Sequence, residues 1–495
     1  MLFNSIEFLI FFPIVTILYF LLPHKWRWLL LLLASCMFYM AFIPVYIFVL
    51  FATIIVDYSA GLLMERSIGR RRQIYLVVSI VFTIAILFVF KYFNFFNTNI
   101  ALIANFFHWN YPIEALKIIL PIGLSFHTFQ SMSYVIEVYR GKQKVERNFG
   151  IYALYVMFYP QLVAGPIERP QNLLHQFYEP HYFEYQRAID SLKLMIWGLF
   201  KKVVIADRLA ILVNHIYGNP SGYTGIPLIV ATLFFAIQIY CDFSGYSDIA
   251  IGSAQFMGFK LMDNFNRPYF SKSIAEFWKR WHISLSTWFR DYLYIPLGGN
   301  RVSNHRWYYN LFITFLISGL WHGANWTYII WGALNGFYLI FGIWTEKIRE
   351  KAADLIGLSR YPLIYKYTKV AITFSLVCFA WIFFRASNVF DALYIISHIL
   401  SGTAETIRNM ISGDYAVARS LLVGKGLGLP INEILLGSLF TALLIAFHYI
   451  QRHGSIRHML SEKPIYFRWA AYYLIVITIL VFGVFNKSQF IYFQF

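Results

Sequence analysis

Ile74-Tyr-Leu-Val-Val-Ser-Ile-Val-Phe-Thr-Ile-Ala-Ile-Leu-Phe-Val-Phe90 contains no charged side chain. A run of this kind approaches the roughly 20 apolar residues that a helix needs to cross the hydrocarbon layer of a bilayer. Because lipid cannot hydrogen-bond to the backbone, such a segment must be helical. About a dozen apolar runs recur along the chain, for example at residues 6–22, 29–43, 312–320, 435–450 and 470–484. We therefore predict an all-α, polytopic membrane protein.

The composition supports the same prediction. Of 495 residues, 59% are hydrophobic and 13% are charged, whereas soluble globular proteins carry about a quarter charged residues. The net charge of +17 is compatible with nucleic-acid binding, but the basic residues lie mainly in short loops between apolar runs, as at Arg66 and Arg70-Arg71-Arg72. This is the positive-inside pattern of membrane proteins. We therefore predict contact with a lipid bilayer and no nucleic-acid partner.

The basic loops also predict an orientation. Residues 1–7 carry no basic side chain, so the first apolar run is a retained spanning helix and not a signal peptide. The turn at Pro44 and the stretch 95–112 are predicted to lie outside, and both termini are predicted to be extracytoplasmic. Five basic loops are predicted to be cytoplasmic: residues 25–27, 66–72, 140–147, 347–351 and 452–463.

We expect one membrane domain over residues 1–495. Residues 1–140 and 361–495 are mostly plain spanning helices, whereas residues 149–345 mix apolar runs with Gly, Pro, His and acidic residues. Polar groups at membrane depth are costly and usually line a cavity or a pathway. The middle section is therefore the predicted functional core.

Two segments of this core are too polar to be simple spans. Residues 273–297 place Trp278 and Trp281 at helical spacing, with His282 on the same aromatic face, which predicts one amphipathic helix. Residues 187–217 interrupt an apolar pattern with Lys201 and Lys202. We expect both segments to be interfacial or re-entrant, and the second to lie along the inner surface.

The leading catalytic candidate is His322, in Ser318-Gly-Leu-Trp-His-Gly-Ala-Asn-Trp326. It follows an apolar run, so a spanning helix brings an imidazole to membrane depth. Burial favours a neutral histidine, which can take a proton from a hydroxyl group. Gly319 and Gly323 are one turn apart and are expected to let another backbone approach closely, and Ser318 and Asn325 are expected to share the face of His322. The alternative is a structural histidine bonded to a neighbouring helix.

The other polar residues are weaker candidates. His282 gains weight only if it shares a cavity with His322, and His127 and His448 fit structural roles better. Asp242 and Asp248 lie in an apolar stretch and need donors, for which the sequence offers Arg267, Arg290 or tyrosine hydroxyls. The histidines lack a metal-binding spacing, and the three cysteines are in apolar segments. No metal site and no disulfide is predicted.

Six motifs in the sequence are specific enough to compare with known families. They are Ala164-Gly-Pro-Ile-Glu-Arg169, Cys241-Asp-Phe-Ser-Gly-Tyr-Ser-Asp248, Glu276-Phe-Trp-Lys-Arg-Trp-His-Ile-Ser-Leu-Ser-Thr-Trp-Phe-Arg-Asp-Tyr292, Tyr294-Ile-Pro-Leu-Gly-Gly-Asn-Arg301, Gly319-Leu-Trp-His-Gly323 and Trp381-Ile-Phe-Phe-Arg385. Together they resemble the motifs of the membrane-bound O-acyltransferase family, and of its bacterial alginate O-acetylation branch in particular. More distantly, they resemble the branch that D-alanylates teichoic acid. The similarity covers nearly the whole chain.

The resemblance implies eleven or more spanning helices, together with re-entrant or amphipathic helices, ringed around a thin central tunnel. It implies catalytic roles for His322 and His282. Residues of the motifs and their neighbours are then candidates to contact substrate or line the tunnel: Gln238, Asp242, Trp278, Trp281, Arg290, Asp291, Ser318, Trp321 and Asn325.

The reaction that the resemblance implies is transfer of an acetyl group from a cytoplasmic activated donor such as acetyl-CoA. No bound cofactor is expected. The acetyl group would cross a bacterial inner membrane and reach an envelope polysaccharide through an extracytoplasmic partner resembling SGNH hydrolases. Candidate partners for the phosphates of the donor are Lys201, Lys202, Lys279, Arg280 and Arg301.

Two other classes of function remain open at this point. A transporter or flippase would use Asp242, Asp248 and His322 as a proton relay, but it does not explain the Trp-His element of residues 273–297. A scaffold for an envelope assembly would leave the two histidines without a role.

Overall fold

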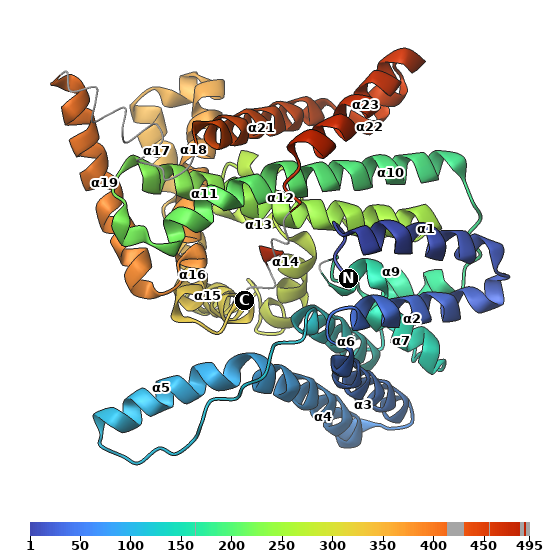
Figure 1. Ribbon diagram of the computed structural model, residues 1–495. Helices are drawn as coiled ribbons and strands as arrows, with labels where there is room; N and C mark the ends of the chain where they lie inside the picture. Colours follow the sequence, from blue (N-terminus) through green and yellow to red (C-terminus); the bar gives the residue numbers. More distant parts are fainter. Residues whose placement is uncertain (164, 413–429, 455, 486–489, 492–495) are drawn as a thin grey trace. The chain divides into compact units, whose positions relative to one another are not determined.

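The structure is a computed structural model that describes residues 1–163, 165–412, 430–454, 456–485 and 490–491. Every regular element within these residues is a helix (Figure 1), which confirms the predicted all-α fold. Side-chain caps mark several helix starts. Ser5 accepts a hydrogen bond from the backbone N–H of Phe8, and Asn148 accepts one from Gly150.

Within the described part of the chain, seven helical segments are long and apolar enough to cross a membrane. Two shorter apolar helices, Ile6–Leu21 and Val389–Ala404, accompany them. The predicted number of eleven or more spans stays a prediction. The seven segments are Pro44–Glu65, Gly69–Phe106, Ile226–Met257, Trp326–Trp344, Pro362–Arg385, Ile431–Ile450 and Ile465–Phe482.

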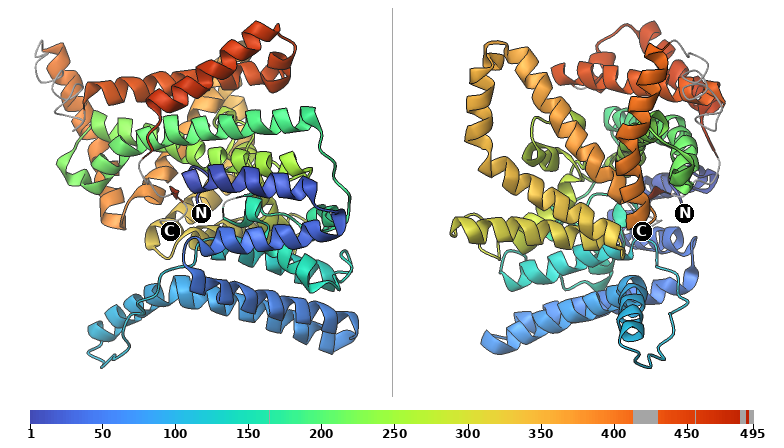
Figure 2. Two further views of the ribbon diagram at one scale, coloured as in Figure 1. Left: turned by 45° about the vertical axis from the view of Figure 1, so that its right-hand side comes forward. Right: turned by 90° about the vertical axis from the view of Figure 1, so that its left-hand side faces the viewer.

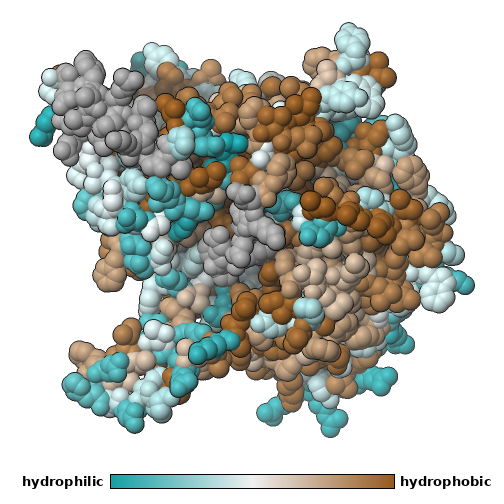
Figure 3. Space-filling view, in the orientation of Figure 1, coloured by the Kyte–Doolittle hydropathy of each residue, from teal (hydrophilic) through white to brown (hydrophobic). Residues whose placement is uncertain are grey.

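Large apolar side chains are exposed on many of these helices. Helix α1 (Ile6–Leu21) leaves Ile6 and Leu21 each 74% exposed, and only 6% of the apolar window of α23 (Ile465–Phe482) is buried. Figure 3 shows hydrophobic residues over much of the face in view, including the surface over α1. Surfaces of this kind are unfavourable in water and match the hydrocarbon of a bilayer.

The chain forms two compact units. Unit 1 comprises residues 1–195 and 246–263, and unit 2 comprises residues 196–245 and 264–495. Helices α10 (Tyr185–Leu199) and α12 (Ile226–Met257) contribute residues to both units.

In unit 1, helices α3, α4 and α6 pack against one another, and α2 packs against α7. The chain bends between α4 and α5, where residues Phe88–Tyr92 are π-helical (Figures 1 and 2). The first part of the predicted outer stretch 95–112 is therefore helical, since α5 extends to Phe106. The other helices of unit 1 are α2 (His24–Met40), α3 (Ile47–Glu65), α4 (Gly69–Leu87), α5 (Phe93–Phe106), α6 (Leu124–Tyr139), α7 (Phe149–Met157), α8 (Tyr159–Leu162) and α9 (Pro170–Leu173).

Unit 2 contains the functional candidates, apart from Asp248 and His127, which belong to unit 1. Helices α15 and α16 form its most extensive pair, and α16 also packs against α13 and α18. The remaining helices of this unit are α11 (Asp207–Gly218), α13 (Ile274–Arg280), α14 (Ile283–Phe289), α15 (Asn304–His322), α16 (Trp326–Trp344), α17 (Glu346–Leu355), α18 (Pro362–Arg385), α19 (Val389–Ile411), α21 (Ile431–Ile450) and α22 (Ile456–Ser461).

Candidate functional site

His322 is the last residue of α15, and a close crossing of α15 with α16 positions it. A Cβ atom on Gly319 would lie 2.3 Å from the backbone oxygen of Tyr328, and one on Gly332 would lie 2.4 Å from that of Phe315. Only glycine permits this approach. Gly319 therefore has the role that the sequence predicts, while its partner Gly332 was not anticipated. Gly323 does not have that role, because a Cβ there would meet the side chain of Tyr328 at 2.2 Å and not another backbone.

The imidazole of His322 is enclosed by aromatic rings and is only 4% exposed. Its ring centroid lies 5.0 Å from Trp331 of α16, 5.3 Å from Phe384 of α18 and 4.9 Å from the adjacent Trp321. All three contacts are edge-to-face, the arrangement that aromatic quadrupoles prefer. Aromatic side chains of three helices, α15, α16 and α18, therefore shield the His322 imidazole from water.

His282 lies between two helices and not within one. Residues 273–297, predicted as a single amphipathic helix, instead form α13, α14 and the π-helical segment Arg290–Tyr294. The break falls at Trp281, which is extended, and at His282, whose φ of 40° is left-handed. Such a conformation is uncommon for a residue other than glycine and often occurs at functional sites.

The segment that begins at Asn264 stabilises this break by hydrogen bonds to residues on both sides of it. The backbone oxygen of Asn264 accepts a hydrogen bond from Ile283 N (2.9 Å), and Asn266 N donates to Arg280 O (2.9 Å). The side chain of Asn264 accepts a bond from Ser284 Oγ at 2.6 Å. Asn264 thereby supplies acceptors at the start of α14 that a continuous helix would have supplied internally. The helical spacing of the tryptophans does not reveal this interaction, because it comes from a different segment of the chain.

The structure brings the two candidate catalytic histidines to the same indole. The ring of Trp321 lies 4.9 Å from His322 and 6.5 Å from His282 between centroids. His282 is fully buried and meets Phe243 edge-to-face at 4.5 Å. Burial lowers the pKa of His282 to about 3, so its imidazole is neutral at physiological pH.

Tryptophans from three helices surround this centre. Trp278 donates from Nε1 to Asn335 Oδ1 at 3.2 Å, and Trp281 lies 5.2 Å from Trp381 of α18. Trp331 and Trp381 stack at 5.8 Å with an interplanar angle of 16°. These rings pack α13, α16 and α18 into one aromatic core.

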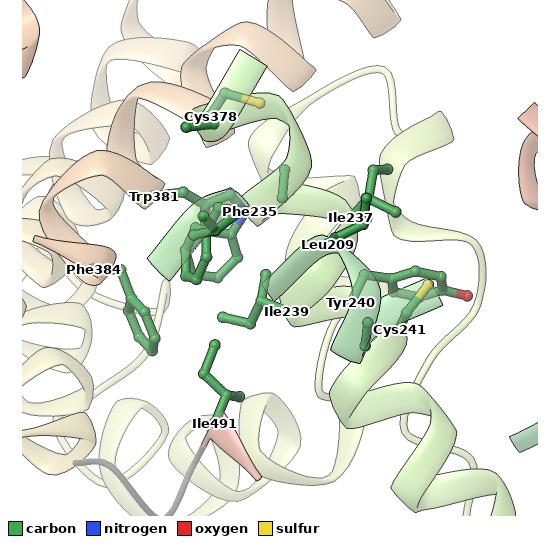
Figure 4. Close-up of a cluster of buried hydrophobic side chains, with 14 of the residues drawn as sticks. Leu209, Phe235, Ile237, Ile239, Tyr240, Cys241, Cys378, Trp381, Phe384 and Ile491 are labelled. Carbon is green, nitrogen blue, oxygen red and sulfur yellow. The ribbon is translucent and has the colours of Figure 1, made fainter. Parts of the chain in front are cut away.

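Figure 4 shows part of this core, with Trp381 and Phe384 extending from α18 toward Ile239 of α12. In the same view Ile491 lies beyond Ile239. Sequence reasoning named Trp278 and Trp281 but missed Trp331, and it assigned no role to Trp381 or Phe384. Trp381 and Phe384 both belong to the motif Trp381-Ile-Phe-Phe-Arg385, which is the sequence signal for them.

Ser318 and Asn325, which the sequence places on the face of His322, differ in position in the structure. Ser318 is buried one turn earlier on α15. Asn325 does not share the helical face of His322, because α15 ends there and Gly323 is extended. Its side chain instead caps α16 by accepting from Thr327 N (3.1 Å) and donating to Ser387 O (3.1 Å).

Asp242 is paired with a donor that the sequence did not suggest. Lys202 Nζ lies 2.7 Å from Asp242 Oδ1 and 2.8 Å from Asp207 Oδ1, and Ile491 N donates to Asp242 Oδ2 at 2.8 Å. Burial opposes the charge on Lys202, but the two carboxylates outweigh it and raise the pKa of Lys202. The expectation of arginine or tyrosine donors for Asp242 is therefore wrong.

The same contacts revise the predicted surface position of residues 187–217. Lys201 is 3% exposed and donates to Ser244 Oγ at 2.9 Å, and Lys202 is 1% exposed. Residues Phe200–Ala206 are π-helical and fully buried. Lys201 and Lys202 are therefore not available to the phosphates of a donor in solution.

Arg290, Asp291 and Gln238 are the remaining candidates for contact with substrate. Arg290 is exposed and bonds to its neighbour Asp291 at 2.8 Å. Gln238 is buried on α12, one turn before Asp242. His127 hydrogen-bonds to Thr53, and His448 hydrogen-bonds to Tyr240.

Comparison with known proteins places the chain among membrane enzymes. Residues 147–383 match the model of the membrane-bound O-acyltransferase family. The chain is 44% identical to the probable alginate O-acetylase AlgI of Pseudomonas aeruginosa over 394 residues, which cover 79% of this chain and 73% of the relative. It is 35% identical to the peptidoglycan O-acetyltransferase of Helicobacter pylori over 434 residues, or 80% and 79% of the two chains. The teichoic acid D-alanyltransferase of Bacillus subtilis is 28% identical over 288 residues, covering 53% of this chain and 68% of the relative.

Proposed function

The chain belongs to the membrane-bound O-acyltransferase family, in the branch of the alginate O-acetylases, and from this premise we propose that it acetylates a cell-envelope polysaccharide. The donor is a cytoplasmic activated acetyl group such as acetyl-CoA. The acetyl group crosses a bacterial inner membrane and reaches the polysaccharide through an extracytoplasmic partner that resembles SGNH hydrolases. Relatives named for alginate and peptidoglycan O-acetylation support a glycan acceptor.

The observation that carries this proposal is the pair of buried histidines at one indole. His322 acts as the general base: the acceptor oxygen attacks the thioester carbonyl while its proton passes to the imidazole. The carbon–sulfur bond then breaks, and the proton moves on to the departing thiolate. The enclosure of His322 by Trp331, Phe384 and Trp321 supports this role, because it holds the imidazole in one place and shields it from bulk water.

His282 acts at the developing negative charge. The carbonyl oxygen of the thioester becomes an oxyanion in the tetrahedral intermediate, and donors positioned in advance stabilise it. Because His282 is neutral, one of its ring nitrogens carries a proton and can donate to that oxyanion. The indole N–H of Trp321 is the second candidate donor, since the Trp321 ring neighbours both imidazoles.

Five basic residues were candidates for binding the phosphates of the donor, and the burial of Lys201 and Lys202 leaves three of them. Lys279 and Arg301 are exposed, and Arg280 is partly exposed in an ion pair with Glu276. We assign donor binding to Lys279 and Arg301, because charged groups accessible to water can meet an anionic donor without breaking an internal ion pair.

The test is release of free CoA from acetyl-CoA by purified protein in the presence of its extracytoplasmic partner. His322→Ala should reduce the rate by about 100-fold or more, the usual contribution of a general base. The matched control is His305→Ala, because His305 lies on the same helix but is exposed near its start. That variant should keep the wild-type rate.

Two outcomes would contradict the proposal. Undiminished release by folded His322→Ala protein would remove His322 from the role of base. If folded wild type released no CoA with any partner, but moved a polar solute across proteoliposomes, the transporter alternative would replace acetyl transfer.

A further inference from the structure

Unit 1 contains a strongly basic surface formed by two segments that are far apart in the sequence. Residues 65–72 connect α3 to α4, and residues 137–147 run from the end of α6 toward α7. Together they carry eight basic side chains and three acidic ones, a net charge of +5. We call residues 65–72 and 137–147 the basic surface.

Specific contacts hold the two segments together. Arg147 forms an ion pair with Glu65 at 3.2 Å, and Tyr58 Oη donates to the backbone oxygen of Arg147 at 2.6 Å. Arg72 donates to Val138 O at 2.8 Å and lies over the ring of Tyr139 at 5.6 Å. The helices that carry the segments, α3, α4 and α6, pack against one another. The basic surface is therefore a fixed feature of the fold.

Most of the basic side chains on this surface form no ion pair with a residue that the structure describes. Arg140 pairs with Glu137, and Arg147 pairs with Glu65. Five others are exposed and form no ion pair with a residue that the structure describes: Arg66, Arg70, Arg71, Lys142 and Lys144. Arg70 and Arg71 also occupy the first turn of α4, where the helix dipole disfavours positive charge. Cations concentrated in this way are stabilised by an anionic partner.

An exposed apolar side chain indicates whether the anionic partner is a lipid or a soluble molecule. Ile68 is 90% exposed between Arg66 and Arg70, and the apolar window of the span Gly69–Phe106 that follows is only 17% buried. A soluble polyanion offers nothing to an isoleucine, whereas the boundary between lipid headgroups and acyl chains accommodates it. Basic clusters beside a spanning helix are typical of contact with anionic lipids.

We propose that the basic surface binds the phosphate groups of anionic phospholipids, with Ile68 inserted at the acyl boundary. The proposal does not depend on the acyltransferase reaction. It assigns a lipid-binding role to residues 65–72 and 137–147, and its test needs no activity measurement.

The test uses full-length protein in phosphatidylcholine nanodiscs with an increasing share of phosphatidylglycerol, with the melting temperature as readout. Phosphatidylglycerol should raise the melting temperature of the wild type. The variant Arg70→Gln/Arg71→Gln/Lys142→Gln/Lys144→Gln should melt like wild type in phosphatidylcholine alone but lose more than half of that rise. If the four-site variant does not fold, Lys142→Gln/Lys144→Gln should lose a smaller part of it.

The matched control is Lys347→Gln/Lys351→Gln. These lysines are also exposed, but they alternate with Glu346, Glu350 and Asp354 on α17, so the control should keep the full rise. Three outcomes would overturn the proposal: no rise with wild type, an equal rise in the basic-surface variants, or the same rise with inorganic phosphate or soluble glycerol phosphate, which would make the site one for free phosphate.

Discussion

At the residue scale, Lys202 is held between two buried carboxylates, and removing it leaves both without their cation. Loss of one partner from a buried ion pair typically costs 3–5 kcal/mol. We expect Lys202→Met to lower the free energy of unfolding by about 3 kcal/mol or more, measured by thermal or denaturant melts. Lys279→Met, at an exposed position of α13, should change it by less than about 0.5 kcal/mol. Equal effects would show that the ion pair with Asp242 and Asp207 does not stabilise the fold.

Glu168 should make stability depend on pH. Its carboxyl group is fully buried, and burial raises its pKa from 4.5 to about 7. A raised folded pKa stabilises the protein below the unfolded value, and this contribution is lost as the pH rises through 7. The Glu168→Gln variant should therefore lose less stability than the wild type between pH 4.5 and 7. Above pH 7 its free energy of unfolding should exceed that of the wild type by at most about 3 kcal/mol. Melts across this pH range test it, and an unchanged slope would contradict it.

At the element scale, the break between α13 and α14 depends on Asn264. Asn264→Ala removes the acceptor for Ser284 Oγ, so the turn that carries His282 loses a buried hydrogen bond. If acetyl transfer is the activity, kcat should fall about tenfold or more through misplacement of His282, with little change in the KM for the donor. Asn264→Asp keeps an acceptor oxygen and should recover most of kcat.

A double-mutant cycle separates positioning by Asn264 from a general loss of stability. Ser284→Ala removes the other partner of the same bond, so the losses in kcat of the two alanine variants should not add in the double variant. Additive losses would show that Asn264 acts on His282 by another route. If the wild type itself catalyses no acetyl transfer, the proposed reaction is wrong, and that result says nothing about the turn at His282.

The crossing of α15 and α16 gives a second prediction for an element. A Cβ on Gly319 would lie 3.0 Å from Gly332 Cα and closer still to the backbone of Tyr328, so Gly319→Ala should push the helices apart and cost about 1–3 kcal/mol. Gly342, on the same α16, has open space around it, and Gly342→Ala should be neutral or stabilising by up to about 1 kcal/mol. Thermal melts compare the two, and equal effects would argue against a tight crossing.

At the scale of the whole molecule, the positive-inside pattern predicts which loops face the cytoplasm. In a background with Cys36→Ser, an impermeant maleimide applied to intact cells should label Asn110→Cys. It should not label Lys142→Cys or Lys351→Cys until the membrane is opened. Both lysines lie in basic loops, and Asn110 lies in the connection after α5. Labelling of Lys142→Cys from outside would reverse the proposed orientation.

Apolar composition and the spacing of charged loops are local properties, so the all-α membrane fold could be predicted without tertiary information. The same holds for His322, because an imidazole that ends an apolar run is unusual wherever it occurs. Gly319 was predictable for a similar reason, since a small residue one turn before a buried histidine permits close packing. The residues alone made His282 a conditional candidate, and the family resemblance added its catalytic role.

The surroundings of these residues depended on contacts between distant segments, and only the tertiary structure decided them. Helical spacing predicted one continuous helix through His282, but Asn264 supplies hydrogen bonds that favour a break. The basic side chain of Lys202 predicted a position at the surface, but Lys202 is buried in the protein and forms ion pairs with Asp242 and Asp207. A sequence pattern records which residues share a face of one helix. It does not record which other segment will satisfy a buried charge or backbone group, and burial makes that choice energetically decisive.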